Sequence, residues 1–489
     1  MNILAVIDTR WDTSYAKQSW QNYARTRDAV QEKIQSEVQK HAFLGPNEEI
    51  QADLKTKSEE IYAALKNACA GFDAILYVYA DEPFLDARLT KKMLENHIKY
   101  FADFSFAEGY PQGLAPMIVS TRIFDDLIEL AKTQSNVNSL MRRRNFFFET
   151  IKKDLNRFSI ETQISPVDVR ALRIALNYQN KNNSEICNKI LSSGAKDADA
   201  ILERVQSRPD LLWGIPAYYN IQISSNCPQK CSYCPYGAHE NFNKNIFMST
   251  QHFRRILDQA HELSDQGVIS LSYMGEPSLH QDFPAMMRAV LEKPNFSLHI
   301  ETSGLGWSEE AWTALLSLDR DRISLIISLD SQKEALYKKV RGEGFQEAMA
   351  FINRALAEFK DNTWIQSVRQ KILEPDLEPF YRHFQELQAQ TIIQKYNNFC
   401  DTLPNEKPVN IAPLNRHVCW ALQREISIQV NGNVNLCASD LAGKEPLGNA
   451  FKDDLKDIWA RMNEYRMKHT RAEYPRICQN CDEYYIFNF

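Results

Sequence analysis

The sequence lacks the excess of positive charge that nucleic-acid-binding proteins carry. Its 489 residues include 57 lysines and arginines against 63 aspartates and glutamates, which gives a formal net charge of −6. Binding to a phosphate backbone normally leaves a basic footprint on the protein. A nucleic-acid partner is therefore not expected. With 44% hydrophobic and 25% charged residues, the composition is that of a soluble globular protein.

The sequence also lacks a membrane-spanning run and an export signal. No window approaches the roughly 18 consecutive apolar residues that a transmembrane helix needs. The start, MNILAVIDTRWDTS, has no cationic region before its short apolar run and reaches charge at Asp8 and Arg10, unlike a signal peptide. We therefore expect no membrane partner and a cytoplasmic location. In a reducing cytosol, clustered cysteines indicate metal binding or catalysis rather than disulfides.

The ten cysteines are unevenly distributed along the chain. Eight lie beyond residue 220, and seven of these fall into two groups with the spacing of metal ligands. The first group, NCPQKCSYCPYG, contains Cys227, Cys231 and Cys234. Three thiolates can hold a four-iron cube with one iron left open to a cofactor or substrate. The alternative is a zinc ion with His239 as fourth ligand.

The chain is long enough for roughly three domains. Apolar strands at 2–8, 74–80 and 102–107 alternate with amphipathic stretches such as 48–70, which predicts an α/β domain over 1–165. A polar, helical connector is expected over 166–212.

Residues 213–399 repeat a strand, a turn and an amphipathic helix. This pattern predicts a parallel sheet curved into a partial (βα)6, TIM-like barrel, with the chemistry at the C-terminal ends of the strands. Residues 400–489, rich in Cys, Asn and Pro, are expected to form a small domain organised around metal. The six predicted barrel strands are 218–224, 268–273, 297–302, 323–329, 364–369 and 391–395.

The cysteine triplet follows the first barrel strand and has an aromatic residue, Tyr233, before its third cysteine. In these features it resembles the cluster loop of the radical S-adenosylmethionine (SAM) superfamily. The resemblance implies that SAM chelates the open iron of a 4Fe–4S cluster and that an electron from the cluster cleaves SAM. The product is a 5′-deoxyadenosyl radical, which abstracts hydrogen from the substrate. The reaction also implies an electron donor such as flavodoxin or ferredoxin.

Later strand ends carry further residues that the resemblance assigns to SAM. YMGEPSLH places Gly275 and Glu276 near the SAM amino group. SLDS and YKKVRGEG place Ser328 and Asp330 near the ribose and methionyl ends, and Arg341 near the carboxylate, which a guanidinium binds with two hydrogen bonds. ETSG, at the end of the third strand, is either a similar functional turn or an ordinary one.

The second group of cysteines, Cys419, Cys437, Cys478 and Cys481, makes a complete set of four thiolates. Such a set suits an iron–sulfur cluster or a structural zinc ion. The order of these cysteines resembles the SPASM/twitch extension of radical SAM enzymes. In that extension a Cys is followed by a Gly-x4-Cys hairpin, here at Gly432, and then by a Cys-x2-Cys pair. The resemblance implies an auxiliary 4Fe–4S cluster, here in the shorter twitch form.

Two residues near the second group have open roles. Cys400 is either an extra ligand or a lone buried thiol. Asp440 is a candidate catalytic base or an exposed loop carboxylate. In the sulfatase-maturating relatives an Asp directly follows the hairpin cysteine, whereas this sequence has Ala438, which argues against oxidation of a sulfatase.

The stretch AILYVYADEPFLDARLTKKML resembles nucleotide-sugar cytidylyltransferases, with Asp81 in the position that binds the metal–nucleotide. The loop IDTRWDTSYAK contains no glycine, so it lacks the exposed backbone amides that cradle a triphosphate. We therefore expect a degenerate domain used for substrate binding or assembly. The arginine run 142–144 is expected to be a solvated helix face.

These segments together resemble the spiro-SPASM group of proteins. The expected function is a radical SAM enzyme acting on a peptide, a protein or a small molecule. The alternatives are a nucleotide-sugar cytidylyltransferase with accessory metal domains and a non-catalytic zinc scaffold.

Overall fold

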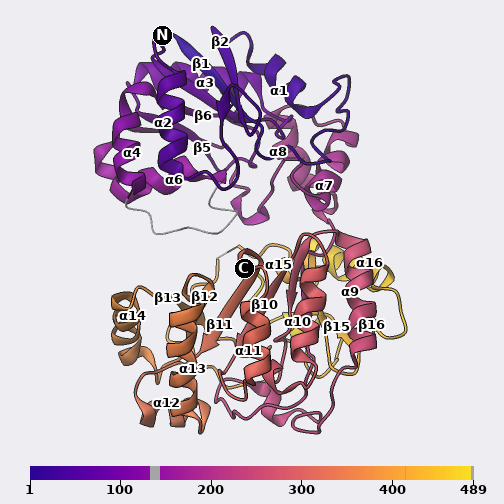
Figure 1. Cartoon of the computed structure of the whole chain (residues 1–489). Helices are drawn as coiled ribbons and strands as arrows, with labels where there is room; N and C mark the ends of the chain where they lie inside the picture. Colours follow the sequence, from indigo (N-terminus) through magenta and orange to yellow (C-terminus); the bar gives the residue numbers. More distant parts are fainter. Residues whose placement is uncertain (133–143, 414, 486–489) are drawn as a thin grey trace. The chain divides into compact units, whose positions relative to one another are not determined.

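The computed structural model describes residues 1–132, 144–413 and 415–485. The chain divides into two compact units, Met1–Gly214 and Ile215–Phe489 (Figure 1). Within the described ranges, no helix combines the length and the apolar character needed to cross a bilayer. The finer division into four segments stays a prediction.

In its described part, the first unit contains a seven-stranded sheet with the order β3-β2-β1-β4-β6-β5-β7. Strand β6 is antiparallel to both of its neighbours, and the other pairs are parallel. Three of these strands, β1, β4 and β5, confirm the ones predicted from the sequence. The strands and longer helices are β1 (Ile3–Asp8), α1 (Thr26–Ile34), β2 (Lys40–Gly45), β3 (Ile50–Gln51), α2 (Ser58–Ala68), β4 (Ala74–Tyr79), α3 (Ala87–Lys99), β5 (Phe104–Glu108), β6 (Met117–Ser120), α4 (Phe124–Lys132), α6 (Phe146–Ile151), β7 (Ile160–Ile164), α7 (Lys181–Ser192) and α8 (Ala198–Ser207).

Alternate side chains of β1 enter two different cores. Ile7 packs with α1, α3, α7 and α8 on one face of the sheet, and Val6 packs with α2, α4 and α6 on the other. A strand covered by helices on both faces is apolar throughout, which is why ILAVID is recognisable in the sequence. Helices α7 and α8, from the predicted connector, contribute Cys187 and Ile201 to the first of these cores.

The prediction for the amphipathic stretch 48–70 was wrong in its first half. Helix α2 begins only at Ser58. Before it, the carboxylate of Asp53 accepts hydrogen bonds from the backbone amides of Lys55 and Thr56. This local turn satisfies the backbone outside a helix, so the helix starts after it.

In the second unit, the described residues form a nine-stranded sheet with the order β13-β12-β11-β10-β9-β8-β14-β15-β16. Strands β8 to β13 are parallel neighbours in chain order, which confirms the predicted α/β partial barrel. The elements are β8 (Tyr218–Ile221), α9 (Thr250–Ser264), β9 (Gly267–Ser270), α10 (Phe283–Glu292), β10 (Phe296–Thr302), α11 (Glu309–Leu316), β11 (Ile323–Ser328), α12 (Glu334–Arg341), α13 (Phe345–Glu358), β12 (Thr363–Arg369), α14 (Leu377–Glu386), β13 (Gln390–Lys395), α15 (Trp420–Arg424), β14 (Glu425–Ile428), β15 (Asn433–Asn435), β16 (Pro446–Asn449) and α16 (Leu455–Thr470).

The cysteine-rich C-terminal segment extends the barrel sheet. Strand β14 pairs in parallel with the first barrel strand, β8, with Glu425 opposite Tyr218. Strands β15 and β16 then continue antiparallel, after a turn in which Gly432 has φ +84°. Helix α16 packs against α9 (Figure 1). This pairing fixes the second cysteine group relative to the barrel.

Candidate active site

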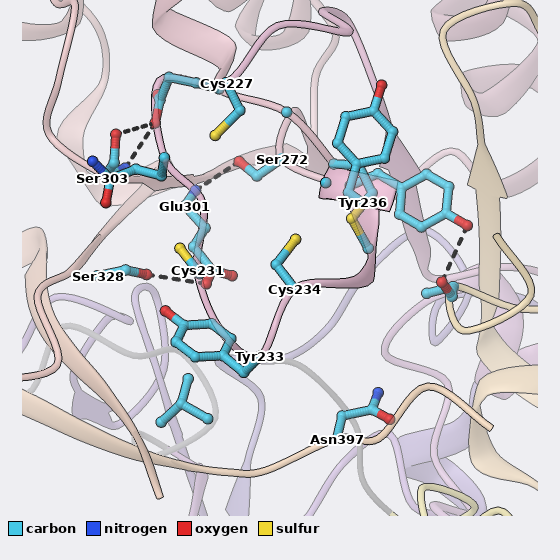
Figure 2. A pocket seen from close by; sticks show the side chains of 18 of the residues that line it. Cys227, Cys231, Tyr233, Cys234, Tyr236, Ser272, Glu301, Ser303, Ser328 and Asn397 are labelled. Atoms are coloured by element: carbon cyan, nitrogen blue, oxygen red, sulfur yellow. Dashed lines mark hydrogen bonds between the residues drawn. The ribbon is translucent and has the colours of Figure 1, made fainter. Parts of the chain in front are cut away.

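A cavity of 680 Å³ lies at the C-terminal ends of the barrel strands. Figure 2 shows the three cysteines of one loop around it, with their sulfur atoms turned into the same space. Nearly all of the predicted cluster and SAM residues line this cavity. The predicted residues in its lining are Cys227, Cys231, Tyr233, Cys234, Gly275, Glu276, Ser328 and Arg341.

The cysteine loop is fixed by the C-terminal end of α12. The backbone amide of Lys230 donates to the carbonyl of Arg341 at 3.0 Å, and that of Ser232 donates to the carbonyl of Val340 at 2.8 Å. The last carbonyls of a helix have no partner within the helix, so they are available to a docking loop. The YKKVRGEG motif therefore also has a structural role.

Burial raises the pKa of all three thiols, that of Cys234 to about 11. Buried thiols of this kind become thiolates when a metal centre supplies the compensating positive charge. His239, the fourth ligand of the zinc alternative, uses both ring nitrogens elsewhere. Its Nε2 lies 3.1 Å from the carbonyl of Leu441, and its Nδ1 accepts from the backbone amide of Asn241. These bonds disfavour a zinc site completed by His239.

Gly275 and Glu276 form a turn that joins the ends of two strands. Gly275 has φ +81°, and a Cβ at this position would lie 2.2 Å from the carbonyl oxygen of Ser224, so only glycine fits. The Glu276 carboxylate accepts from Thr302 Oγ1 at 2.6 Å and from the backbone amide of Ser303 at 2.8 Å. The GEP and ETSG motifs are thus connected to each other.

Asp330 pairs with Arg341 and Tyr233. Its Oδ2 accepts from Arg341 Nη1 at 2.8 Å and from the Tyr233 hydroxyl at 2.7 Å, and its Oδ1 accepts from the backbone amide of Val368. The side chains of Asp330 and Arg341 are 1% and 5% exposed. Asp330 does not line the cavity. It lies behind Arg341 and Tyr233, which do.

Glu301, at the end of β10, was missed by the sequence analysis. It lines the cavity, and its Oε1 accepts from Ser328 Oγ at 3.3 Å (Figure 2). The same oxygen also accepts from Gln366 Nε2 at 2.6 Å. Burial raises the pKa of its carboxyl group. The sequence signal for this residue was the glutamate that begins the ETSG motif. It lies on the strand just before the turn and points into the barrel, as alternate residues of a strand do.

The four cysteines of the second group come together although they lie up to 62 positions apart in the chain. Cys437 interacts electrostatically with Cys419, Cys478 and Cys481, and burial raises the pKa of Cys419 and of Cys478 to about 12. Among the described residues, no group of three or more His, Cys, Asp or Glu side chains is arranged to bind a single metal ion. A four-iron cube does not need such a position, because each thiolate binds a different iron.

Asp440, the predicted base, lies in the hairpin that follows Cys437. Its two carboxylate oxygens each accept a backbone amide at 2.9 Å, from Lys444 and Glu445. It is 3% exposed, so the alternative of an exposed loop carboxylate is wrong. The hairpin contributes Ala438 to the cavity lining instead.

Two family models match the second unit. The model of the radical SAM superfamily matches residues 221–368, and the SPASM model, an iron–sulfur cluster-binding domain, matches residues 419–482. The chain belongs to the radical SAM superfamily. It is an enzyme of SAM-dependent radical chemistry, and membership implies a 4Fe–4S cluster with SAM and, from SPASM, auxiliary iron–sulfur binding.

Individual relatives of this radical SAM enzyme differ in how much of the chain they match. A Treponema pallidum (strain Nichols) protein described as "Uncharacterized protein" is 33% identical over 358 residues, which cover 71% of this chain and 99% of that protein. A GTP 3′,8-cyclase of Psychromonas ingrahamii is 26% identical over 143 residues, 28% of this chain and 40% of the cyclase.

Solved structures of low identity also match. Streptococcus suis SuiB bound to precursor peptide SuiA has a TM-score of 0.45 at 15% identity, covering 68% of this chain and 78% of SuiB. BtrN in complex with AdoMet and 2-DOIA has a TM-score of 0.37 at 19% identity, covering 55% of this chain and 93% of BtrN.

The cavity of the radical SAM barrel fits the group that the family implies. The Nε atom of Arg341, a cavity-lining residue, is buried and has no hydrogen-bond partner among the described residues. A guanidinium edge with an unused donor suits a carboxylate such as that of SAM. The three thiols match the three-ligand cube that leaves one iron open.

In the first unit, the acidic residues at the ends of β1 and β4 are already paired. Asp8 accepts two hydrogen bonds from Arg10, and Asp81 accepts two from Arg144 at 3.0 and 2.6 Å. Arg144 also pairs with Glu82 at 2.8 Å. The prediction of a solvated run at 142–144 was wrong for Arg144, which is 4% exposed, because Asp81 and Glu82 compensate its buried charge; 142 and 143 lie outside the described residues.

Proposed function

We propose that this radical SAM enzyme binds SAM in the 680 Å³ cavity and abstracts hydrogen from a peptide, a protein or a small molecule. The observation that carries the proposal is that three half-buried cysteines and Arg341, whose Nε has no hydrogen-bond partner among the described residues, line one cavity. When bound, a 4Fe–4S cluster on the three thiolates supplies the electron that cleaves SAM to the 5′-deoxyadenosyl radical.

The residues of the chain would position SAM as follows. Arg341 holds the carboxylate through its Nε, while its Nη1 remains on Asp330. Gly275 lets the chain approach the amino group, because it carries no Cβ. Ser328 and Glu301 face the cavity from neighbouring strand ends and are suited to the ribose hydroxyl groups.

The substrate would occupy the side of the cavity that adjoins the auxiliary thiols. Lys395, at the end of β13, and Asn397, two residues later, line this side together with Ala438 of the hairpin. SuiB binds a precursor peptide and BtrN binds 2-DOIA, so a peptide and a small molecule both remain candidate substrate classes. The auxiliary cluster, proposed on Cys419, Cys437, Cys478 and Cys481, would accept an electron from the substrate or anchor it. Flavodoxin or ferredoxin is the proposed electron donor.

For the first unit we infer a degenerate nucleotidyltransferase-like domain without transferase activity. A cytidylyltransferase needs Asp81 free for its metal–nucleotide, and here Arg144 occupies both oxygens of that carboxylate. Breaking a buried pair of this kind costs about 3–5 kcal/mol. The proposed use of this unit in substrate binding or assembly follows from the sequence resemblance.

The test is formation of 5′-deoxyadenosine by anaerobically reconstituted protein with SAM and dithionite. The control is the variant Cys227→Ala/Cys231→Ala/Cys234→Ala, which should retain the auxiliary iron and form no nucleoside. Nucleoside from the wild type alone supports the proposal. A wild-type protein that contains zinc in place of iron and sulfide, and forms no nucleoside, refutes it and supports the zinc scaffold.

A further inference from the structure

An arginine without an acidic partner lies beside the auxiliary cysteines. Arg416 is three residues before Cys419, and no acidic side chain within the described ranges forms an ion pair with it. Its Nη1 donates to the carbonyl oxygen of Gln479 at 3.4 Å, and its Nε is buried and has no hydrogen-bond partner among those residues. Gln479 lies between Cys478 and Cys481. A guanidinium stays protonated in a folded protein, so a positive charge lies next to the Cys-x2-Cys loop.

The Arg416 segment is held against the chain that follows the Cys-x2-Cys pair. The Tyr484 hydroxyl donates to the carbonyl of Pro413 at 2.7 Å, and the backbone amide of Trp420 donates to the carbonyl of Tyr484 at 2.8 Å. Between these two bonds, the guanidinium of Arg416 lies 4.0 Å from the ring centroid of Tyr474 and 4.9 Å from that of Tyr484. Aromatic faces attract a cation and fix its plane without neutralising its charge.

The other charged side chains around this loop compensate one another. Asp482 accepts from Lys407 at 2.6 Å and pairs with Lys395 at 3.1 Å. Glu483 also pairs with Lys395. Two lysines and two acids contribute no net charge, so the charge of Arg416 is added to a neutral group of side chains.

An uncompensated positive charge at this place suits an iron–sulfur cluster. A four-iron cube held by four thiolates carries net negative charge, and its reduction adds one more negative charge. A nearby cation in a poorly hydrated site therefore stabilises the reduced form more than the oxidised form. The thiols respond in the same sense, since burial raises the pKa of Cys478 to about 12, whereas the charge of Arg416 acts to lower it.

We propose that Arg416 is the counter-ion of the auxiliary cluster and raises its reduction potential. A higher potential favours the accepting role over the anchoring role. The accepted electron comes from the substrate radical that hydrogen abstraction leaves, and the oxidised substrate releases a proton to solvent, so electrons and charge balance. Arg416 does not line the main cavity, and it acts as a positioning residue through its charge. The proposal rests on the proposed assignment of the auxiliary cluster.

The test measures the reduction potential of the auxiliary cluster in the full chain. The parent protein carries Cys227→Ala/Cys231→Ala/Cys234→Ala, so that only auxiliary iron remains. Arg416→Gln, which removes the charge, and Arg416→Lys, which keeps it, are each placed onto this parent. Iron and sulfide are counted, and the reduced cluster is titrated against potential by electron paramagnetic resonance.

The matched control is Arg320→Gln on the same parent. Arg320 donates to the carbonyl of Glu358 at 3.0 Å and lies 5.3 Å from the ring centroid of Phe359, so it makes the same two kinds of contact as Arg416. It lies just before β11, whereas the cavity lies at the C-terminal ends of the barrel strands. The control therefore removes a similar arginine far from the auxiliary cysteines.

The counter-ion role predicts that Arg416→Gln keeps the parent's iron and sulfide but lowers the ratio of reduced to oxidised cluster at least about tenfold at a given potential. For a one-electron couple this is a shift of about 59 mV to more negative potential. Arg416→Lys should stay within about threefold of the parent, or about 28 mV, and Arg320→Gln should not differ from it.

Three results would overturn the proposal. The first is an Arg416→Gln protein with the parent's potential, or one that shifts no more than Arg320→Gln. The second is an Arg416→Lys protein that shifts as much as Arg416→Gln, because both lose the stacked guanidinium and only one loses the charge. The third is loss of iron from Arg416→Gln, which assigns a purely structural role. A parent without iron overturns the auxiliary assignment as well, but leaves 5′-deoxyadenosine formation by the wild type unaffected.

Discussion

Replacing Asp330 by Asn tests whether this residue supports the SAM site from behind. The change keeps the shape of the side chain, and Asn tolerates the left-handed backbone at this position, where φ is +69°. It removes the negative charge that faces Arg341 Nη1 at 2.8 Å and the Tyr233 hydroxyl at 2.7 Å. An amide NH2 turned toward these two donors cannot accept from them.

The expected cost follows from burial. Both partners are almost fully buried, so Asp330→Asn leaves the Arg341 cation without compensation, which costs about 3–5 kcal/mol. For a unit of this size we expect the melting temperature to fall by about 6–12 °C. The control is Glu374→Gln, which breaks the Arg369–Glu374 pair, whose side chains are 39% and 40% exposed. That change should cost less than about 1 kcal/mol.

The assay is thermal unfolding of anaerobically reconstituted protein, with SAM binding measured in parallel. Adding Arg341→Met to Asp330→Asn should recover part of the lost stability, because it removes the unpaired charge. The reasoning is refuted if Asp330→Asn melts within about 2 °C of the wild type. If such a variant also binds SAM weakly, Asp330 contacts SAM directly, as the sequence resemblance implies.

Two further predictions concern a glycine and a buried acid. Gly275→Ala should weaken SAM binding at least about tenfold, since its Cβ would lie 2.2 Å from the Ser224 carbonyl oxygen. The control is Gly194→Ala, which shares the left-handed backbone at φ +85°, meets nothing within 4 Å and does not line the cavity, so it should leave the affinity unchanged. Equal affinities of the two variants would contradict the turn geometry. Burial raises the pKa of Glu425 from 4.5 to about 7, so its protonated form stabilises the fold below pH 4.5 and this contribution, up to about 3 kcal/mol, is lost as pH rises through 7. Glu425→Gln should therefore have a higher melting temperature than the wild type at pH 8 and a similar one at pH 4.5. A melting-temperature difference that stays the same from pH 4.5 to pH 8 would contradict the raised pKa of Glu425.

The barrel could be predicted from the sequence because its strands are buried on both faces. Such strands are short apolar runs, like ISLIIS at β11, and the structure confirms all six within a few residues. Helix α16 was missed because two of its buried positions are Arg466 and His469. Arg466 is buried by donating to the Leu422 carbonyl and stacking on Trp459, which no periodicity of apolar residues reveals.

The cysteine groups were predictable because spacing alone carries their signal, but the partners of other site residues were not. Arg144 lies 63 positions from Asp81, and no local pattern connects them. Asp401 accepts from Asn480, 79 positions away, so only the tertiary structure brings the loop after β13 to the Cys-x2-Cys loop. Contacts between distant segments depend on the tertiary structure. Sequence motifs therefore predict which residues belong to a site more reliably than they predict the hydrogen-bond partners of those residues.

For the acidic residues of the second unit, the hydrogen-bond partners found in the structure change the predicted chemical role. Glu276, Asp330 and Asp440 were each assigned to SAM or substrate, and the structure bonds each carboxylate to donors of the protein itself. Glu301 faces the cavity, but burial raises its pKa and so favours the neutral form. A cluster held by thiolates is rich in negative charge, and a free carboxylate in the same low-dielectric space would be repelled by it and by the SAM carboxylate. With the acids paired internally, the Nε of Arg341, a residue of the cavity lining, has no partner among the described residues, which is the polarity that an anionic carboxylate requires.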